Sequence, residues 1–132
     1  MQGGGLIIGV HKDVQSALVR EGDDDIEALV IHVEVEGITI KVVNAYGPQE
    51  NADKNKKDKF WEFLEEETVK AELENIGMII QMDGNMHAGP EVLKYDPNSQ
   101  NKNGKLLEEF LERNKGLIVA NNMNICEGII TR

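Results

Sequence analysis

Apolar residues recur at every second position over two short segments in the first third of the chain. Every second residue from 29 to 35 is apolar, whereas His32 and Glu34 occupy positions between them, and the alternation resumes over 38–42. A period of two is typical of strands with one buried face, and a two-residue connection that ends in Gly37 favours a tight hairpin. We expect two antiparallel strands, with the apolar face on the core and the polar face in solvent.

The residues before this hairpin show two different patterns. Residues 3–10 form a short apolar run behind a glycine lead, which predicts a strand. Residues 11–27 are polar and mixed and end in an acidic run at 21–25, which predicts a solvated loop.

Two later segments have the period of an amphipathic helix. In the first, Phe60, Phe63, Leu64 and Ala71 share one face of a helix that begins near Asn55 as its N-cap and ends near residue 75. The second helix begins near residues 103–104 and carries apolar residues at helical spacing up to position 111.

A short apolar run, Met78 to Met82, lies between these helices and predicts a buried strand that ends at Asp83. The second hairpin strand likewise ends at Tyr46, before the Gly-Pro pair at 47–48. A strand, a helix and another strand in this order indicate a crossover unit on a sheet of mixed pairing. Tyr46 and Asp83 would then end two strands, where α/β sheets usually present their chemistry.

Composition places limits on the function. The 132 residues predict a single domain, and 40% apolar with 29% charged residues is typical of a globular protein. No apolar run is long enough to span a membrane. A lone cysteine, Cys126, and the absence of a signal peptide predict an intracellular location, nuclear or cytoplasmic. A net charge of −10 argues against binding of nucleic acid through a basic surface.

Asp83, Asn85 and His87 follow one another at alternate positions after the predicted strand. Two interpretations are open for this stretch. Asp-Gly-Asn is favourable turn chemistry with Asx hydrogen bonds. Alternatively, a carboxylate and an amide at a strand end suit hard cations and phosphate oxygens. His87 is the weakest candidate of the three.

Several motifs in order give the chain a resemblance to a known superfamily. They are Val-Val-Asn-Ala-Tyr-Gly-Pro at 42–48, Phe-Trp at 60–61, Met-Asp-Gly-Asn-Met-His-Ala-Gly at 82–89, Asn-Gly-Lys-Leu-Leu-Glu-Glu-Phe at 103–110, Asn-Asn-Met at 121–123 and the closing residues 126–132. Together they resemble the endonuclease/exonuclease/phosphatase superfamily. Within it, they look like the endonuclease domain of non-LTR retrotransposons, which is joined to a reverse transcriptase in a larger polypeptide.

The resemblance implies a DNase I-like fold, an α/β domain of the α+β type in which two sheets form a sandwich flanked by helices. It implies a DNA endonuclease that uses Mg²⁺ or Mn²⁺. Asp83 would orient or deprotonate the attacking water, with a tentative role as metal ligand. Asn85 and the Tyr46 hydroxyl would contact the phosphate, with His87 as a lesser phosphate contact.

The sequence departs from the family pattern in three ways. Met82 stands where the motif has glycine, and neither the family's metal-binding glutamate nor its closing Asp and Ser-Asp-His motifs are present. We therefore expect residues 1–132 to form a partial domain that is inactive or nearly so, because such catalytic sets act as a unit. Two alternatives stay open: a non-catalytic remnant that serves as a binding or structural module, and a superfamily phosphatase acting on a small or lipid phosphate.

Overall fold

A computed structural model describes residues 5–94 and 96–123 of the chain. These residues form two compact units. The first comprises residues up to 48 together with 52–84, and the second comprises 49–51 and the residues from 85 onward. The expectation of a single domain stays a prediction.

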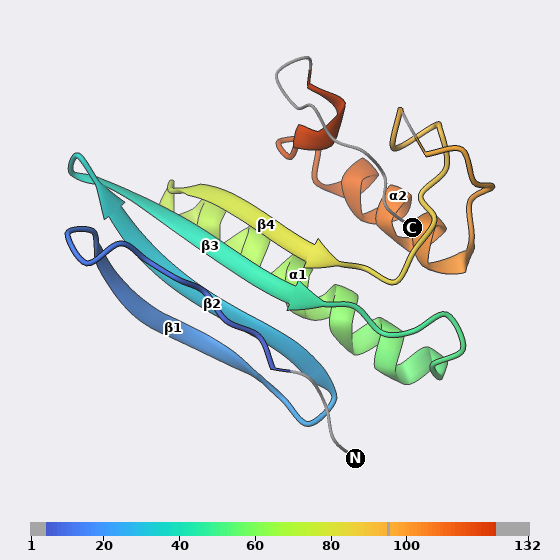
Figure 1. Cartoon of the computed structure of the whole chain (residues 1–132), viewed down its shortest axis with the longest axis horizontal. Helices are drawn as coiled ribbons and strands as arrows, with labels where there is room; N and C mark the ends of the chain where they lie inside the picture. Colours follow the sequence, from blue (N-terminus) through green and yellow to red (C-terminus); the bar gives the residue numbers. More distant parts are fainter. Residues whose placement is uncertain (1–4, 95, 124–132) are drawn as a thin grey trace. The chain divides into compact units, whose positions relative to one another are not determined.

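The first unit is built on one four-stranded sheet (Figure 1). Its strands are β1 (Gln15–Asp23), β2 (Ile26–Val35), β3 (Ile38–Tyr46) and β4 (Gly77–Asp83), in that spatial order. β1, β2 and β3 form an antiparallel meander, and β4 pairs with β3 in parallel. The predicted hairpin and the mixed strand pairing are therefore confirmed.

The hairpin between β2 and β3 turns on Glu36 and Gly37, which have φ angles of 52° and 79°. Two consecutive residues with positive φ match the right-handed twist of the two strands that they join. Glycine reaches this region without steric cost, which explains why it is the second residue of the turn.

Helix α1 (Lys54–Glu74) connects β3 to β4 and covers one face of the sheet (Figure 1). The N-cap is Asp53, whose side chain accepts a hydrogen bond from the backbone N–H of Lys56, so the predicted cap at Asn55 was wrong by two residues. The helix ends at Asn75, whose φ of 53° provides a left-handed C-terminal cap. Both the helix and the parallel crossover match the prediction from the sequence.

The core lies between α1 and one face of the sheet. The helix buries its aromatic and aliphatic residues there, as the spacing predicted, against four small or branched strand residues. These strand residues are Ala28, Val30, Val43 and Ala45, and the main helical ones are Phe60, Trp61, Phe63, Leu64 and Ala71.

The predicted orientation of the hairpin is wrong, because the even-numbered face of β2 meets the helix. Ala28 and Val30 are buried there, whereas Val33 and Val35 belong to the opposite face. Two cations explain the choice of face: Lys41 of β3 and Arg20 of β1 both donate hydrogen bonds to the Glu67 carboxylate on α1. Turning the sheet over would bury the other apolar set but would separate these charges.

The start of the chain also differs from the prediction. Residues 5–10 do not form a strand, and residues 15–23, expected as a loop, form β1. The polar sequence of β1 is compatible with a strand because β1 lies at the edge of the sheet and is mostly exposed. β4 is the other edge within the described residues, and each of its residues is partly or fully exposed, so the prediction of a buried strand was also wrong.

The second unit contains helix α2 (Lys102–Arg113) and a short 3-10 helix, η1 (Ala120–Asn122). The side chain of Asn101 caps α2 by accepting a hydrogen bond from the N–H of Gly104 at 2.8 Å. Across the described residues the chain is thus a mixed α/β protein, with one four-stranded sheet and two α-helices. None of the described helices is long and apolar enough to cross a membrane.

Candidate functional site

Tyr46 and Asp83 end neighbouring strands and lie directly opposite each other in the parallel ladder of β3 and β4. The N–H of Gly47 donates a 2.7 Å hydrogen bond to the carbonyl oxygen of Asp83, which continues the pairing one residue beyond β3. Residues opposite each other in a sheet present their side chains on the same face. The structure therefore brings together two of the predicted site residues.

Tyr46 and Asp83 lie on the face of the sheet opposite α1, called the open face from here on. Lys41, Val43 and Ala45 alternate along β3 on the helix side, so Asn44 and Tyr46 belong to the open face. Along β4 the exposed positions 77, 79, 81 and 83 belong to this same face. Tyr46 is 37% exposed, and Asp83 is also exposed, so both are accessible to a ligand.

Two glycines allow the ends of these strands to approach closely. A Cβ on Gly47 would lie 2.9 Å from both the Cα and the carbonyl oxygen of Gly84. Because those contacts are with backbone, a larger residue at position 47 would force the two segments apart. The glycine of the Tyr-Gly-Pro sequence is thus required by the packing beside Tyr46 and Asp83.

Glu27 extends this polar row across a third strand. It lies opposite Tyr46 in the antiparallel ladder of β2 and β3, and its side chain is exposed on the open face. The row therefore reads Glu27, Tyr46, Asp83 across three adjacent strands. Sequence reasoning missed Glu27 because it was included in the expected loop, although it lies two residues before the first apolar position of the alternating hairpin.

Asn85 and His87 belong to the second unit, where they form part of a segment that packs on the start of α2. The Nδ2 group of Asn103 donates to the carbonyl of Asn85 at 3.0 Å. The N–H of His87 donates to the side chain of Asn101, whose own N–H donates back to the His87 carbonyl at 3.0 Å. Asn85 has a φ of 48°, a conformation that asparagine tolerates better than most residues. The chain bends at Asn85, which is compatible with the predicted turn, and its Asx hydrogen bonds stay a prediction.

Gly104 explains how closely this segment approaches α2. A Cβ at this position would lie 2.0 Å from the carbonyl oxygen of His87, which only a glycine avoids. Asn103 is buried beside it, and its N–H donates to the Glu50 carboxylate at 3.4 Å. The Asn-Gly pair at 103–104 thus serves to dock the segment that carries Asn85 and His87.

Asp96 organises the loop between that segment and α2. Its carboxylate accepts hydrogen bonds from the N–H groups of Asn98 at 2.9 Å and Gly89 at 3.2 Å, and it is 4% exposed. The backbone N–H of Asn98, followed by those of Gly89 and Ala88, holds the pKa of Asp96 below its usual range, although burial opposes the shift. The loop expected from its turn residues is therefore held together by one buried carboxylate.

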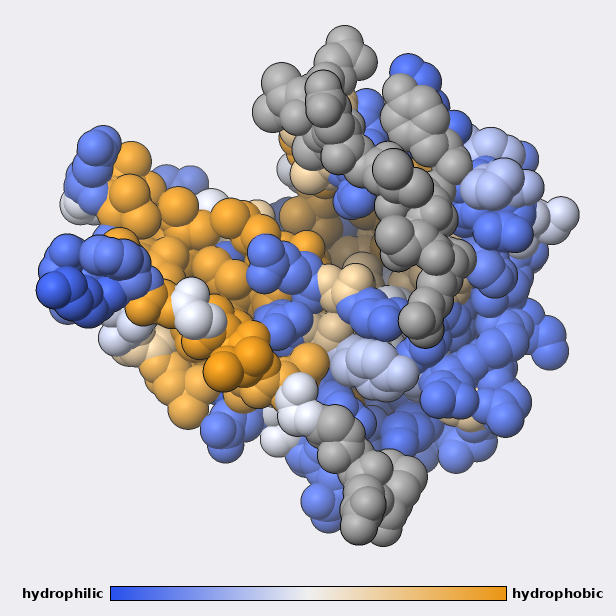
Figure 2. Space-filling model, in the orientation of Figure 1, coloured by the Kyte–Doolittle hydropathy of each residue, from blue (hydrophilic) through white to orange (hydrophobic). Residues whose placement is uncertain are grey.

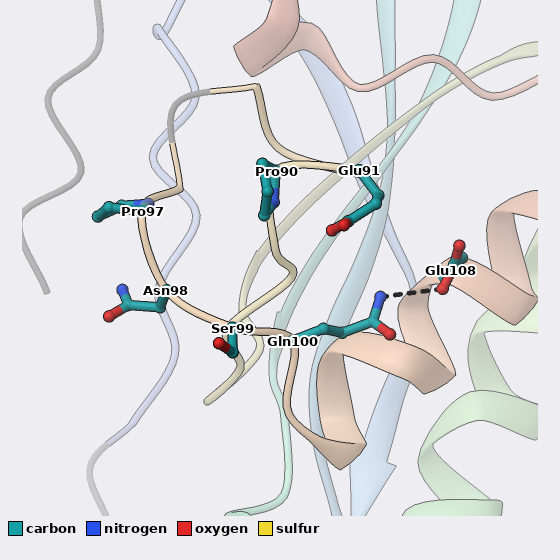
Figure 3. Close-up of a pocket in the computed structure, with 7 residues that line it drawn as sticks. All are labelled: Pro90, Glu91, Pro97, Asn98, Ser99, Gln100 and Glu108. Atoms are coloured by element: carbon teal, nitrogen blue, oxygen red, sulfur yellow. Dashed lines mark hydrogen bonds between the residues drawn. The ribbon is translucent and has the colours of Figure 1, made fainter.

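A hollow of about 510 Å³ lies along the same loop and is lined by polar residues and two prolines (Figure 3). Across it, the Nε2 group of Gln100 donates to Glu108 at 2.9 Å and to the carbonyl of Ala88 at 3.2 Å. The side-chain NH₂ group of Gln100 therefore donates both of its hydrogen bonds within the protein.

The described residues do not by themselves complete a metal centre. No group of three or more His, Cys, Asp or Glu side chains within them is arranged to hold a metal ion. Asp83 supplies one carboxylate, and a Mg²⁺ site needs further oxygen ligands from water or substrate phosphate. Of the lysines at the start of α1, Lys54 pairs with Asp58 and Lys59 with Asp25, and Lys57 is buried.

Comparison with known proteins gives no family: no protein-family model, curated protein or solved structure matches the chain. The closing motif at 126–132, which contributed to the superfamily resemblance, lies outside the described residues.

Proposed function

We propose that this chain carries the phosphate-positioning part of a metal-dependent DNA endonuclease site, and that its sheet is one layer of a two-sheet sandwich. The observation that supports this most strongly is the pairing of Tyr46 with Asp83 on one face at adjacent strand ends. Turn chemistry alone accounts for the residues after Gly84, but it does not require a phenol beside a carboxylate on the neighbouring strand.

The two side chains have complementary roles in phosphodiester cleavage. The Tyr46 hydroxyl is a hydrogen-bond donor for a non-bridging phosphate oxygen. The Asp83 carboxylate is an acceptor that can orient a water molecule for in-line attack and take its proton. By the superfamily resemblance, the Asn85 amide would donate a further hydrogen bond to the phosphate. A divalent ion, when bound, would neutralise charge on the phosphoryl oxygens.

Cleavage by the 132 residues alone is expected to be negligible. Asp83 is one carboxylate, and the described residues supply no cluster that completes a metal site. Since members of a catalytic set act as a unit, the residual rate should be lower by orders of magnitude than that of a complete site.

Binding, rather than turnover, therefore provides the test of the proposal. We would measure the affinity for a short fluorescein-labelled DNA duplex by anisotropy, for wild type, Asp83→Asn and Glu34→Gln. Glu34 lies near the opposite end of β2 and is also exposed, so its variant removes the same charge from the same sheet. In EDTA both variants should bind slightly more tightly, because each weakens repulsion of the phosphates.

With Mg²⁺ the two variants should diverge. Asp83→Asn should bind about 5-fold more weakly than Glu34→Gln, because the loss of a charge-assisted contact is worth on the order of 1 kcal/mol. Equal affinities for the two variants in Mg²⁺ would overturn the proposal. Plasmid nicking by the wild-type chain that Asp83→Ala abolishes would instead contradict the expected inactivity.

One observation favours a second function, a binding module. The open face of the sheet carries the exposed apolar side chains of Leu18, Ile38 and Ile79, which a partner could cover in place of a second sheet.

A further inference from the structure

Helix α1 carries a second stripe of aligned residues on the side that faces away from the sheet. Glu62, Glu66, Val69 and Leu73 recur at helical spacing, so they share one face of the helix, which we call the outer stripe. All four are exposed, whereas the aromatic and aliphatic residues that pack on the sheet lie on the opposite side of α1. The outer stripe is therefore a surface separate from the open face of the sheet.

Val69 and Leu73 make the C-terminal part of this stripe apolar. Val69 is 44% exposed and Leu73 is 82% exposed. Single exposed apolar residues are normal on a monomer. Residues at positions i and i+4 are neighbours on a helix, however, so these two side chains form one apolar step that a single partner can cover.

The surface around this step is acidic. Between residues 60 and 74 the chain has one basic residue, Lys70, which binds Glu67 at 3.1 Å. The exposed acidic residues of the same stretch are Glu62, Glu66, Glu72 and Glu74. One of them, Glu66, binds Arg20 at 2.8 Å. A partner that covers Val69 and Leu73 therefore meets several carboxylates, and complementarity requires it to be basic.

The same charges are placed where they weaken the helix. The first turn of α1 holds no acidic residue and the last turn holds no basic one. The dipole of a helix favours the opposite arrangement, because its C-terminal end is partly negative. Glu72 and Glu74 therefore repel the end of the helix on which they lie, and a cation held beside them would relieve this repulsion. The acidic end of α1 thus points, independently of the apolar step, to a positively charged partner.

A second copy of the chain fits the outer stripe poorly. A parallel pair of stripes would oppose like carboxylates along its whole length. An antiparallel pair that joins the two apolar steps overlaps by only about two helical turns, roughly 11 Å. That is far less contact than the roughly 800 Å² per partner of a stable interface.

We propose that the outer stripe of α1 binds a basic amphipathic helix of a partner polypeptide. Apolar residues of that helix, at helical spacing, would pack on Val69 and Leu73. Its Lys or Arg side chains would lie beside Glu62 and Glu72, near the negative end of α1. This inference does not depend on the proposed nuclease site, because it uses neither the open face nor any residue assigned to the phosphate.

Three synthetic peptides provide the probe. The first carries leucines on one helical face with lysines on both sides of them. The second has glutamates in place of the lysines, and the third is a scramble of the first in which the leucines no longer share a face. Binding of each fluorescein-labelled peptide to the full chain is measured by anisotropy at physiological salt. The first peptide should bind about 5-fold or more tightly than either of the others.

A pair of apolar substitutions tests which surface the peptide covers. Leu73→Gln should weaken binding of the first peptide by about 5-fold or more, whereas Ile38→Gln should leave it unchanged. Ile38 is 63% exposed and belongs to the open face, where Figure 2 shows a hydrophobic area over the strands. It therefore controls for the loss of an exposed apolar side chain elsewhere. Unchanged fluorescence of the buried Trp61 in the free variants verifies that both are folded.

A charge substitution gives a readout that loss of structure does not produce. Glu72→Gln should weaken binding of the first peptide by about 3-fold. It should also raise the urea midpoint of the free protein, because it removes repulsion at the end of the helix. Glu34→Gln removes the same charge from an exposed position on β2 and should leave binding unchanged.

Three results would overturn the inference. They are equal binding of the first peptide and its scramble, equal effects of Leu73→Gln and Ile38→Gln, and a dimer in sedimentation that Leu73→Gln dissociates. The last result would assign the outer stripe to a second copy of the chain. The DNA-binding assay uses a different ligand and different residues, so failure of either proposal is recognised without reference to the other.

Discussion

Replacing Glu67 by glutamine tests how the first unit is held together. The Glu67 side chain is 1% exposed and accepts hydrogen bonds from Lys41 at 3.1 Å, Arg20 at 2.8 Å and Lys70 at 3.1 Å. Lys41 is itself 1% exposed, and its ammonium group also donates to the Glu67 carbonyl at 3.1 Å. Glu67→Gln keeps the volume and an acceptor but leaves the Lys41 charge buried without a counter-charge.

The expected cost follows from which cations can reach water. Arg20 and Lys70 have side chains 34% and 49% exposed, so both can turn to solvent at little cost. Lys41 cannot, and breaking one partner of a buried pair costs about 3–5 kcal/mol. Because the carbonyl contact survives, we expect about 3 kcal/mol, a large share of the roughly 5–15 kcal/mol that stabilises a typical domain.

Two further variants separate the charge from other effects. Lys41→Met should cost about 1 kcal/mol, because Glu67 keeps its other two cations, and the double variant should cost less than the sum of the singles. Glu66→Gln is the matched control. The side chain of Glu66 is 57% exposed and binds Arg20 at 2.8 Å, so its loss should cost less than about 1 kcal/mol.

Urea unfolding followed by the fluorescence of Trp61, the single tryptophan, reports the free energy of this unit. A Glu67→Gln cost no larger than that of Glu66→Gln would show that the buried pair of Lys41 and Glu67 does not stabilise the unit. The pH dependence adds a second check. Burial raises the pKa of Glu67, but hydrogen bonds from Arg20, Lys41 and Lys70 lower it by more than burial raises it, so the net shift is downward. Its stabilisation is therefore present above the unfolded value of 4.5 and is lost as pH falls through the folded pKa, and Glu67→Gln should flatten this acid limb.

Three further predictions concern the strand ends and the second unit. Gly47→Ala should destabilise the first unit by about 1–3 kcal/mol through its clash with backbone atoms, whereas Gly77→Ala, with nothing within 4 Å, should be neutral in the same urea assay. Gly104→Ala should open the second unit and speed exchange of its amide protons, and Gly116→Ala, also with open space around it, should not. Asp96→Asn should speed exchange of the loop amides at neutral pH and have little effect well below pH 3.8. Because the pKa of Asp96 is lowered in the folded protein, its carboxylate stabilises the loop above the unfolded pKa, and this stabilisation is lost as pH falls through the folded pKa.

Sequence patterns identified the hairpin, α1 and the parallel crossover because each has a strong local signal. Gly37 marks the turn, and Phe60, Phe63 and Leu64 mark the buried side of the helix. The prediction that strands end at Tyr46 and Asp83 followed from the same signals. Their register, which places the two residues opposite each other, is a non-local property that the sequence pattern did not specify.

The failures have one physical source, contacts between distant segments. β1 is polar and has no helical or alternating signal, yet it forms a strand because β2 offers it an edge and because Arg20 reaches the helix. The choice of buried face was wrong for the same reason, since both faces of β2 are apolar and the pairing of Lys41 with Glu67 decides between them. Glu27 was missed as a member of the site row because membership depends on strand pairing.

The position of bound DNA on the sheet distinguishes a phosphate site at the ends of β3 and β4 from binding elsewhere. Backbone amide shifts of the ¹⁵N-labelled chain are recorded during titration with a short DNA duplex in Mg²⁺. The largest shifts should occur at Gly47 and Gly84, beside Tyr46 and Asp83, and Tyr46→Phe should reduce them. Shifts confined to the lysines at the start of α1, or unaffected by Tyr46→Phe, would contradict a phosphate site at these two strand ends.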